Sequence, residues 1–354
     1  MNIAPQIAPW VLGFVLVVAS QVAVGEAEVV ARFRFQDVAG VGHEPGVCRR
    51  DPSDVIKVGS TWYVWYSKVT RDQPLYPSGY KATVWYATST DAGRTWVEHG
   101  EAVGIGESGF DAEAVFTPNI LVAGGTYYLA YTAVAQGFTN TSYTEANRTA
   151  IGMAVAESPD GPWGKLETNP ILVSSREPAR FDSFRVDDSC FIVRDERYWL
   201  YYKGRQWENT PRNTKMGLGV AETPTGPYVR QNRGRFIQDS GHEVMVWPFE
   251  GGVCSLVSNT GPQGKTLQYA RDGQHFEVVG QLPDEYPKAP GAYRPDLTGL
   301  DPPEAGIEWG ISMVHGSDPY LIRYEIDIDT GLLEAIRGEN AHGQPRPAIK
   351  GRRP

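Results

Sequence analysis

Runs dominated by aromatic and β-branched residues recur along the chain and predict β-strands. The strongest are TWYVWYS (Thr61 to Ser67), TYYLAYT (Thr126 to Thr132) and RYWLYYK (Arg197 to Lys203), and weaker copies are GVCSLVS (Gly252 to Ser258) and IEWGISM (Ile307 to Met313). Such residues favour strands, and no amphipathic helical pattern separates the runs. The pattern therefore predicts an all-β protein.

Each run is followed by a second strand-like segment that ends at a turn. The five segments are VWYATSTDAGRTW, IGMAVAESPDGPW, MGLGVAETPTGPY, LQYARDGQHF and LIRYEIDIDTGLL. The order is constant and returns roughly every 55 to 70 residues, which fits a four-stranded propeller blade with long loops. We therefore predict a single-domain, five-bladed β-propeller from about Ala31 to Ala335. A β-sandwich of similar hairpins is the alternative fold.

The propeller fold also predicts where the substrate-binding residues lie. Inner strands of the blades converge on a central channel, and their ends form a funnel-shaped pocket. We therefore expect substrate-binding residues at the starts of the blades.

The two ends of the chain differ from this body. An apolar stretch from Pro9 to Gly25 precedes small and acidic residues, which is typical of a secretory signal peptide. We predict a signal peptide at residues 1–25 and a secreted or periplasmic protein, with an uncleaved membrane anchor as the alternative. Residues 336–354 are predicted to form a polar tail that ends in KGRRP.

Charge and cysteine content exclude several classes of partner. The 354 residues carry a formal net charge of -9, whereas binding to nucleic acid or to an anionic membrane requires a basic surface. The three cysteines are far apart and lack CxxC spacing, so neither a zinc site nor a dense disulfide framework is indicated. At most one disulfide can form. A neutral or weakly charged substrate is easier to accommodate than a polyanion.

Acidic residues precede three of the predicted blades. They lie in CRRDPSDVIKVG, which contains Asp51, in FRVDDSCFIV, which contains Asp187, and in GHEVMVWP, which contains His242 and Glu243. Inverting glycoside hydrolysis needs one ionised carboxylate to activate water and one protonated group to release the leaving oxygen. A further carboxylate can orient the sugar and raise the pKa of the acid.

These motifs resemble the five-bladed glycoside hydrolase families 43, 62 and 117. The adjacent His-Glu pair makes the chain most similar to family 117, the 3,6-anhydro-α-L-galactosidases that act on agar-derived oligosaccharides. The resemblance extends from CRRDPSD over nearly the whole remaining chain. It implies exo-acting, inverting hydrolysis that releases a terminal sugar such as 3,6-anhydro-α-L-galactose from algal or plant oligosaccharides.

The resemblance also implies roles for single residues. Asp51 is expected to be the general base and Asp187 the carboxylate that orients the sugar. His242 is the expected general acid with Glu243 supporting it, whereas a family 43 mechanism makes Glu243 the acid. An extra residue before VIKV leaves Asp54 as an alternative to Asp51.

Other residues are candidates for substrate binding. Arg185, Lys203, Arg205 and Trp247 are expected to line the sugar pocket, and His315 in SMVHGSDP to point into the channel. Asp188 is expected to bond to backbone, because alternate residues of a strand face opposite ways. We expect no organic cofactor, assign no metal ligands, and leave a divalent cation in the channel open.

Other functions compete with this interpretation. STDAGRTW, Ser89 to Trp96, matches the Asp-box turn of six-bladed sialidases. A carbohydrate-binding propeller would need the aromatic residues without the acids, and a phosphorylase would need a cationic phosphate pocket. RDPSD and the His242 pair could also be ordinary structural turns. A family 43-like arabinosidase or xylosidase is the remaining enzymatic alternative.

Overall fold

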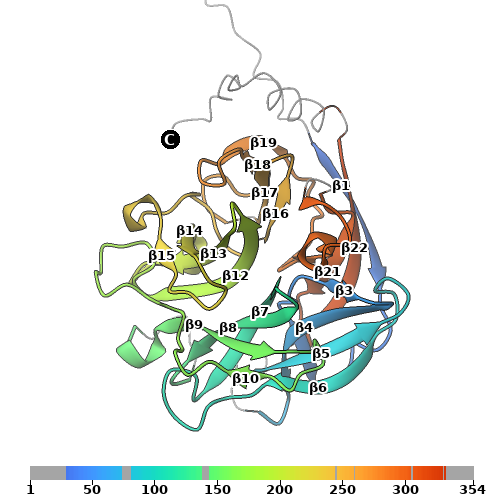
Figure 1. Ribbon diagram of the computed structural model, residues 1–354, viewed down its shortest axis with the longest axis horizontal. Helices are drawn as coiled ribbons and strands as arrows, with labels where there is room; N and C mark the ends of the chain where they lie inside the picture. Colours follow the sequence, from blue (N-terminus) through green and yellow to red (C-terminus); the bar gives the residue numbers. More distant parts are fainter. Residues whose placement is uncertain are drawn as a thin grey trace, which may run out of the picture.

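Five antiparallel sheets stand around a central axis (Figure 1). The computed structural model describes residues 29–73, 81–137, 143–243, 245–258, 260–303, 306–329 and 331. The five-bladed β-propeller predicted from the sequence is confirmed, and the sandwich alternative is wrong. The predicted signal peptide, residues 1–25, and tail, residues 336–354, lie outside the described residues. Among the described helices, none is long and apolar enough to span a membrane.

Each blade follows the order of its strands along the chain. Blade 1 contains β2 (Val47–Arg50), β3 (Ile56–Val58), β4 (Thr61–Thr70), β5 (Thr83–Ser89) and β6 (Val97–Val103). Blade 2 contains β7 (Ala114–Ala123), β8 (Thr126–Val134), β9 (Thr149–Ala156), β10 (Gly164–Lys165) and β11 (Leu172–Val173). Blade 3 contains β12 (Arg185–Arg194), β13 (Arg197–Arg205), β14 (Lys215–Ala221) and β15 (Val229–Arg230). Blade 4 contains β16 (Met245–Phe249), β17 (Gly252–Val257), β18 (Thr266–Ala270) and β19 (Glu277–Gln281).

Blade 5 joins the two ends of the described chain. It contains β20 (Gly291–Ala292), β21 (Trp309–Val314), β22 (Tyr320–Ile328) and, as its outermost strand, β1 (Ala31–Asp37). Strand β1 pairs with β22 in a register that runs from Ala31 opposite Ile328 to Asp37 opposite Ile322. The ring is therefore closed by hydrogen bonds between the first and last strands (Figure 1).

The other regular elements named within the described residues are single turns. These are the 3₁₀ helices η1 (Glu145–Asn147), η2 (Pro211–Asn213), η3 (Asn232–Gly234) and η4 (Pro295–Thr298). Strands β4, β8, β13, β17 and β21 correspond to the five aromatic runs, and each is the second strand of its blade. The segments expected to follow them form β5, β9, β14, β18 and β22.

The hydrophobic core lies between the blades. Trp247 and Phe249 of blade 4 belong to one buried cluster with Tyr324 of blade 5, and Trp309 of blade 5 belongs to another with Tyr66 of blade 1. Both faces of a blade are therefore covered, so β7 and β8 contain long buried runs without polar alternation. Burial of this kind is the main stabilising contribution to such a fold.

The Asp-box segment forms a turn on blade 1. The Asp91 carboxylate accepts hydrogen bonds from the backbone N–H groups of Arg94 (3.1 Å) and Thr95 (2.9 Å), and bonds from Thr95 and other neighbours lower its pKa to about 2. Arg323 of β22 donates to the carbonyl of Ala92 at 3.0 Å. The box therefore fastens blade 1 to blade 5. The propeller has five blades and not the six of a sialidase, which excludes the sialidase alternative.

The three cysteines are buried free thiols. Neither Cys48, Cys190 nor Cys254 forms a disulfide, so the one bridge that the sequence allowed is not made. Burial raises the pKa of Cys48 to about 12. These side chains act as small apolar groups.

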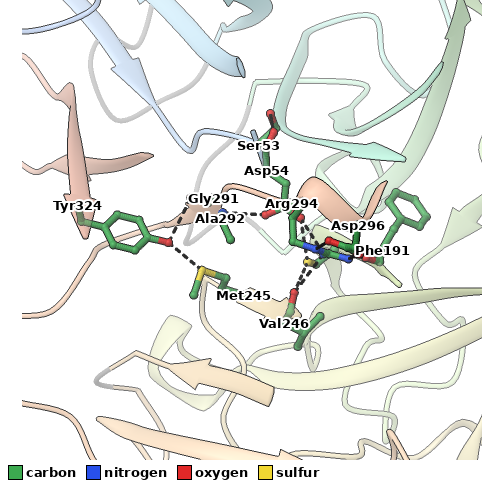
Figure 2. Close-up of polar contacts among 11 residues, drawn as sticks. Ser53, Asp54, Phe191, Met245, Val246, Gly291, Ala292, Arg294, Asp296 and Tyr324 are labelled. Atoms are coloured by element: carbon green, nitrogen blue, oxygen red, sulfur yellow. Dashed lines mark hydrogen bonds and ion pairs between the residues drawn. The ribbon is translucent and has the colours of Figure 1, made fainter. Parts of the chain in front are cut away.

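A buried arginine joins the inner parts of four blades (Figure 2). Arg294 precedes η4, and its Nη1 lies 3.3 Å from Asp54 Oδ2 of blade 1, 3.2 Å from the Phe191 carbonyl of β12 and 3.5 Å from the Val246 carbonyl of β16. Two further bonds of 2.8 Å reach Asp296. Burial disfavours the charge on Arg294, but Asp296 and then Asp54 raise its pKa overall.

Asp54 completes this network from the first blade. Its Oδ1 accepts the backbone N–H of Ala292 at 2.8 Å, and its side chain is 1% exposed. The sequence left Asp54 as an alternative general base. The structure instead places it in the Arg294 network, away from the cavity described below.

We predict that Arg294→Met lowers the free energy of unfolding by about 3–5 kcal/mol, because the buried Asp54 carboxylate loses its cation. Urea unfolding followed by tryptophan fluorescence measures this change. Arg34→Met is the control, since Arg34 forms an exposed ion pair with Glu325 at 2.9 Å and such pairs contribute about 1 kcal/mol or less. Equal losses in the two variants would show that Arg294 is not structurally important.

Candidate functional site

The main candidate site is a cavity of about 240 Å³ at one end of the inner strands. Its volume suits one or two sugar rings more closely than a polymer cleft. Its lining residues come from all five blades or the loops between them: Arg50, Asp51, Phe116, Thr117, Arg185, Asp187, Asp188, Lys203, Arg205, Pro211, Thr214, His242, Glu243 and His315. Asp51, Asp187, His242 and Glu243 are all in this set, whereas the alternative base Asp54 is not; four of the five expected binding residues are also present.

One residue per blade adopts a left-handed backbone conformation beside this cavity. The φ angles are 50° at Asp51, 43° at Thr117, 46° at Asp188, 55° at Glu243 and 40° at Ala289. All five border a smaller cavity of about 30 Å³. A residue with a side chain adopts such a φ angle at a cost of about 1 kcal/mol or more. Backbone strain is therefore concentrated where the blades meet.

Four of the five left-handed residues lie three positions in the sequence before a residue of the Arg294 network. Asp51 precedes Asp54 by three positions, and Asp188 likewise precedes Phe191. Glu243 precedes Val246 by the same interval, as Ala289 does Ala292. The network therefore fixes the inner segments of blades 1, 3, 4 and 5 three residues after the residue that borders the cavities.

Asp51 is held next to a cation at the end of β2. Its Oδ2 lies 3.0 Å from Arg50 Nε. Burial raises the pKa of Asp51, Arg50 opposes this effect, and the charges of Asp188 and Glu243 add to it. The charges of Asp188 and Glu243 are thus close enough to Asp51 to affect its ionisation.

Asp187 and Asp188 share one lysine. Lys203 Nζ lies 2.6 Å from Asp188 Oδ2 and 3.2 Å from Asp187 Oδ1. Burial raises the pKa of Asp187 to about 6 against the effect of Lys203. Burial also opposes ionisation of Asp188, but Lys203 and the backbone N–H of Glu243 lower its pKa overall. Asp188 is therefore the more acidic member of the pair and Asp187 the less acidic one.

A bulge brings both aspartates to the cavity. The β12–β13 register shifts between Asp187 and Cys190, so the alternation of a regular strand fails there. Asp188 does bond to backbone as expected, accepting the Glu243 N–H at 3.1 Å, but it also lines the cavity. The sequence prediction missed this second contact because the bulge has no plain signal in VDDSC.

Glu243 faces two histidines. Its Oε1 lies 3.6 Å from His242 Nε2 and 3.9 Å from His315 Nε2, and its Oε2 accepts the Ala289 N–H at 2.9 Å. Burial and then Lys203 lower the pKa of His242, whereas Glu243 and Asp188 raise it. His242 Nδ1 is buried and has no hydrogen-bond partner among the described residues. The imidazole therefore has Glu243 as its nearest charged support.

One sequence prediction is wrong. Trp247 was expected to line the sugar pocket, but its side chain is fully buried in the core between blades 4 and 5. Only the beginning of an inner strand reaches the channel, and Trp247 lies in the middle of β16, opposite Cys254. Apolar residues at that position pack against the next blade.

The sequence also left several lining residues unidentified. Arg50, Phe116, Thr117, Pro211 and Thr214 border the cavity in addition to Asp188. Thr117 lies in FTPN, which parallels RDPS in the first blade, and this repeat was an available signal. The loop residues Pro211 and Thr214 carry no comparable pattern.

Metal binding has no ready site in the described part of the chain. There, no group of three or more His, Cys, Asp or Glu side chains is arranged to hold an ion. The carboxylates of the cavity instead lie beside Arg50 and Lys203.

Comparison with solved structures places the chain among glycoside hydrolases. Zg3597, a family 117 glycoside hydrolase from the marine bacterium Zobellia galactanivorans, is similar with a TM-score of 0.73 and 26% identity, over 86% of this chain and 93% of that one. The fold is also shared with RS223-β-xylosidase (TM-score 0.58, 10% identity, 84% and 96% covered). A family 43 enzyme from Xanthomonas citri shares it as well (TM-score 0.53, 12% identity, 81% and 90% covered).

No family model matches the chain, and no curated protein matches it. The similarity to family 117 expected from the sequence is nevertheless confirmed by the structure. The protein is a propeller-fold glycoside hydrolase.

Proposed function

We propose that the protein is an exo-acting glycoside hydrolase that inverts the anomeric centre and releases a terminal sugar from algal or plant oligosaccharides. The observation that carries this proposal is the meeting of Asp51, Asp187 and the His242–Glu243 pair at one small cavity. A non-catalytic carbohydrate-binding propeller would not need acids from three blades in one place. A secreted or periplasmic location fits such a substrate and rests on the sequence of residues 1–25.

The proposed identity of the sugar rests only on the similarity of the chain to family 117. Zg3597 is a family 117 enzyme, and family 117 resemblance favours 3,6-anhydro-α-L-galactose at the non-reducing end. A cavity of about 240 Å³ supports attack at a chain end in preference to the middle of a polymer. An arabinoside or xyloside is the alternative substrate if the family 43 mechanism applies.

The proposed reaction assigns one step to each group. Asp51 takes a proton from a water molecule as that water attacks the anomeric carbon, and the glycosidic oxygen leaves with a proton from His242. Glu243 supports the imidazolium, since its carboxylate lies 3.6 Å from His242 Nε2. Asp187 and Asp188, joined by Lys203, are positioned to hold sugar hydroxyls.

We expect the first sugar released to have the inverted anomeric configuration, because the base activates water directly and no covalent intermediate forms. Proton NMR during the first turnovers of neoagarobiose, or of the best substrate from a panel of carrageenan oligosaccharides, arabinosides and xylosides, measures this. Net retention would require a covalent nucleophile and would exclude the role given to Asp51.

Substrates with different leaving groups separate the acid from the base. His242→Ala should lose most activity on a natural glycoside and much less on an activated aryl glycoside, whose leaving group needs little protonation. Asp51→Ala should lose about 10²–10⁴-fold on both, because water must still be activated. Steady-state kcat/KM values on the two substrates decide between these patterns.

The reverse pattern would transfer the role of acid. If Glu243→Gln is rescued by the aryl leaving group while His242→Ala remains nearly as active as the wild type, Glu243 is the acid and the family 43 mechanism applies. If neither variant alters turnover on any cleaved sugar, the pair is a structural turn and the proposed mechanism is wrong.

The pH dependence has a defined sign. The base must be ionised, and burial raises the pKa of Asp51, so the acidic limb should lie above the ordinary aspartate value of about 3.9. The acid must be protonated, and burial lowers the pKa of His242, so the alkaline limb should lie below about 6.5. Profiles of kcat/KM against pH should therefore be narrow and centred on the acidic side of neutrality.

Two variants should move the alkaline limb in opposite directions. Lys203 lowers the pKa of His242 and Glu243 raises it, so Lys203→Met should shift the limb to higher pH and Glu243→Gln to lower pH. An alkaline limb that stays at the same pH in both variants would show that His242 does not donate the proton.

A further inference from the structure

We infer that the substrate carries an anionic substituent, a carboxylate or a sulfate ester, and that Arg185 and Arg205 bind it beside the reacting sugar. The inference rests on the proposed glycoside hydrolase function and specifies the class of oligosaccharide on which the same site acts.

The two arginines stand directly opposite each other on neighbouring strands. Arg185 opens β12, Arg205 ends β13, and the two are register partners. Each is 2% exposed, and both line the cavity. Like charges at directly opposed positions destabilise a sheet, and burial increases the cost. Two adjacent arginines in such a place therefore indicate a function that needs positive charge.

One aromatic ring positions both guanidinium groups. Arg185 lies over the Phe184 ring at 4.1 Å and Arg205 at 5.1 Å from its centroid. Arg185 Nη1 also donates a hydrogen bond to the Asn147 carbonyl. Stacking and hydrogen bonding limit the freedom of these side chains, so less entropy is lost when an anion binds.

The carboxylates of the cavity also have partners other than Arg185 and Arg205. Asp51 pairs with Arg50, and Lys203 holds Asp187 and Asp188. Glu243 faces His242 and His315. Asp187 also raises the pKa of both Arg185 and Arg205, so its charge acts on Lys203 and on the two arginines. With the arginine pair, this wall is more positive than the protein as a whole, whose formal net charge is -9.

Burial and then the charge of Arg205 lower the pKa of Arg185 to about 9, against the opposing charge of Asp187. An anion between the two guanidinium groups would relieve both effects. Carboxylates and sulfate esters accept paired N–H bonds from arginine in the required planar geometry. Neutral hydroxyl groups would leave the repulsion in place.

The strand register places the anion relative to the chemistry. Arg185 and Asp187 lie two positions apart on β12, which corresponds to about 7 Å along a strand. This is close to the width of one sugar ring. The anionic substituent is therefore on the sugar that Asp187 contacts or on its immediate neighbour.

Binding measurements on the hydrolysis-impaired Asp51→Asn protein test the inference without turnover. Isothermal titration calorimetry would compare oligogalacturonides with their methyl esters, and sulfated carrageenan oligosaccharides with desulfated ones. We expect the charged member of at least one pair to bind about tenfold or more tightly, since charge-assisted bonds exceed neutral ones. The pair that shows the preference distinguishes a carboxylate from a sulfate.

Matched variants locate the preference. Arg205→Gln should abolish this preference, because it should weaken binding of the charged member much more than binding of the neutral one. Arg197→Gln is the control, because Arg197 also faces an arginine, Arg194, across the same two strands but at their far end. It should retain the full preference. If Arg205→Gln fails to fold, the charged and neutral ligands still decide the question on Asp51→Asn alone.

Equal affinity for charged and neutral members of both pairs would overturn the inference. So would an equal loss for both in Arg205→Gln. Stimulation of cleavage by inorganic phosphate, with release of a sugar phosphate, would also overturn it by assigning the arginines to an attacking phosphate. Because binding is read without hydrolysis, loss of the proposed enzymatic function would not by itself produce any of these results.

Discussion

The charge of Arg294, buried where the blades meet, is the constraint on which the site depends. Its guanidinium contacts Asp54, the Phe191 carbonyl and the Val246 carbonyl, which belong to three different blades (Figure 2). A buried cation of this kind is tolerated only with a complete set of partners. The need of the buried guanidinium for these partners therefore fixes the inner segments that it contacts relative to one another.

The site residues use that fixed frame. Asp51, Asp188 and Glu243 each stand three positions before a residue of the network, and each has a positive φ angle. Backbone strain at these points brings polar side chains to a common cavity, where carboxylates lie near one another and their pKa values shift. Stability supplied by the apolar packing between blades allows the inner ends to retain strain and buried charge.

The sequence predicted the features that depend on repetition. Aromatic strands at Thr61, Thr126 and Arg197 identified the blades, because packing between blades imposes the same apolar pattern on each. The acids of RDPSD, VDDS and GHEV were found for a similar reason, since each precedes an apolar strand. The resemblance to family 117 supplied the roles assigned to them.

The rest depended on contacts that no local pattern encodes. Trp247 looked suitable for stacking on a sugar but packs in the core, because its depth along β16 decides its environment. Asp188 reaches the cavity through a bulge, and Arg294 reads as an ordinary turn residue in YRPD. The opposition of Arg185 and Arg205 exists only once the register of β12 and β13 is known.

A crystal structure of Asp51→Asn with a bound oligosaccharide tests the central claim most directly, namely that catalysis occurs where the inner segments of the blades meet. The account predicts a terminal sugar in the cavity of about 240 Å³, with its anomeric carbon facing residue 51 through one water and its glycosidic oxygen within hydrogen-bond reach of His242 or Glu243. An oligosaccharide bound elsewhere, such as the groove beside Lys68 and Trp85, with the axial cavity empty, would contradict it.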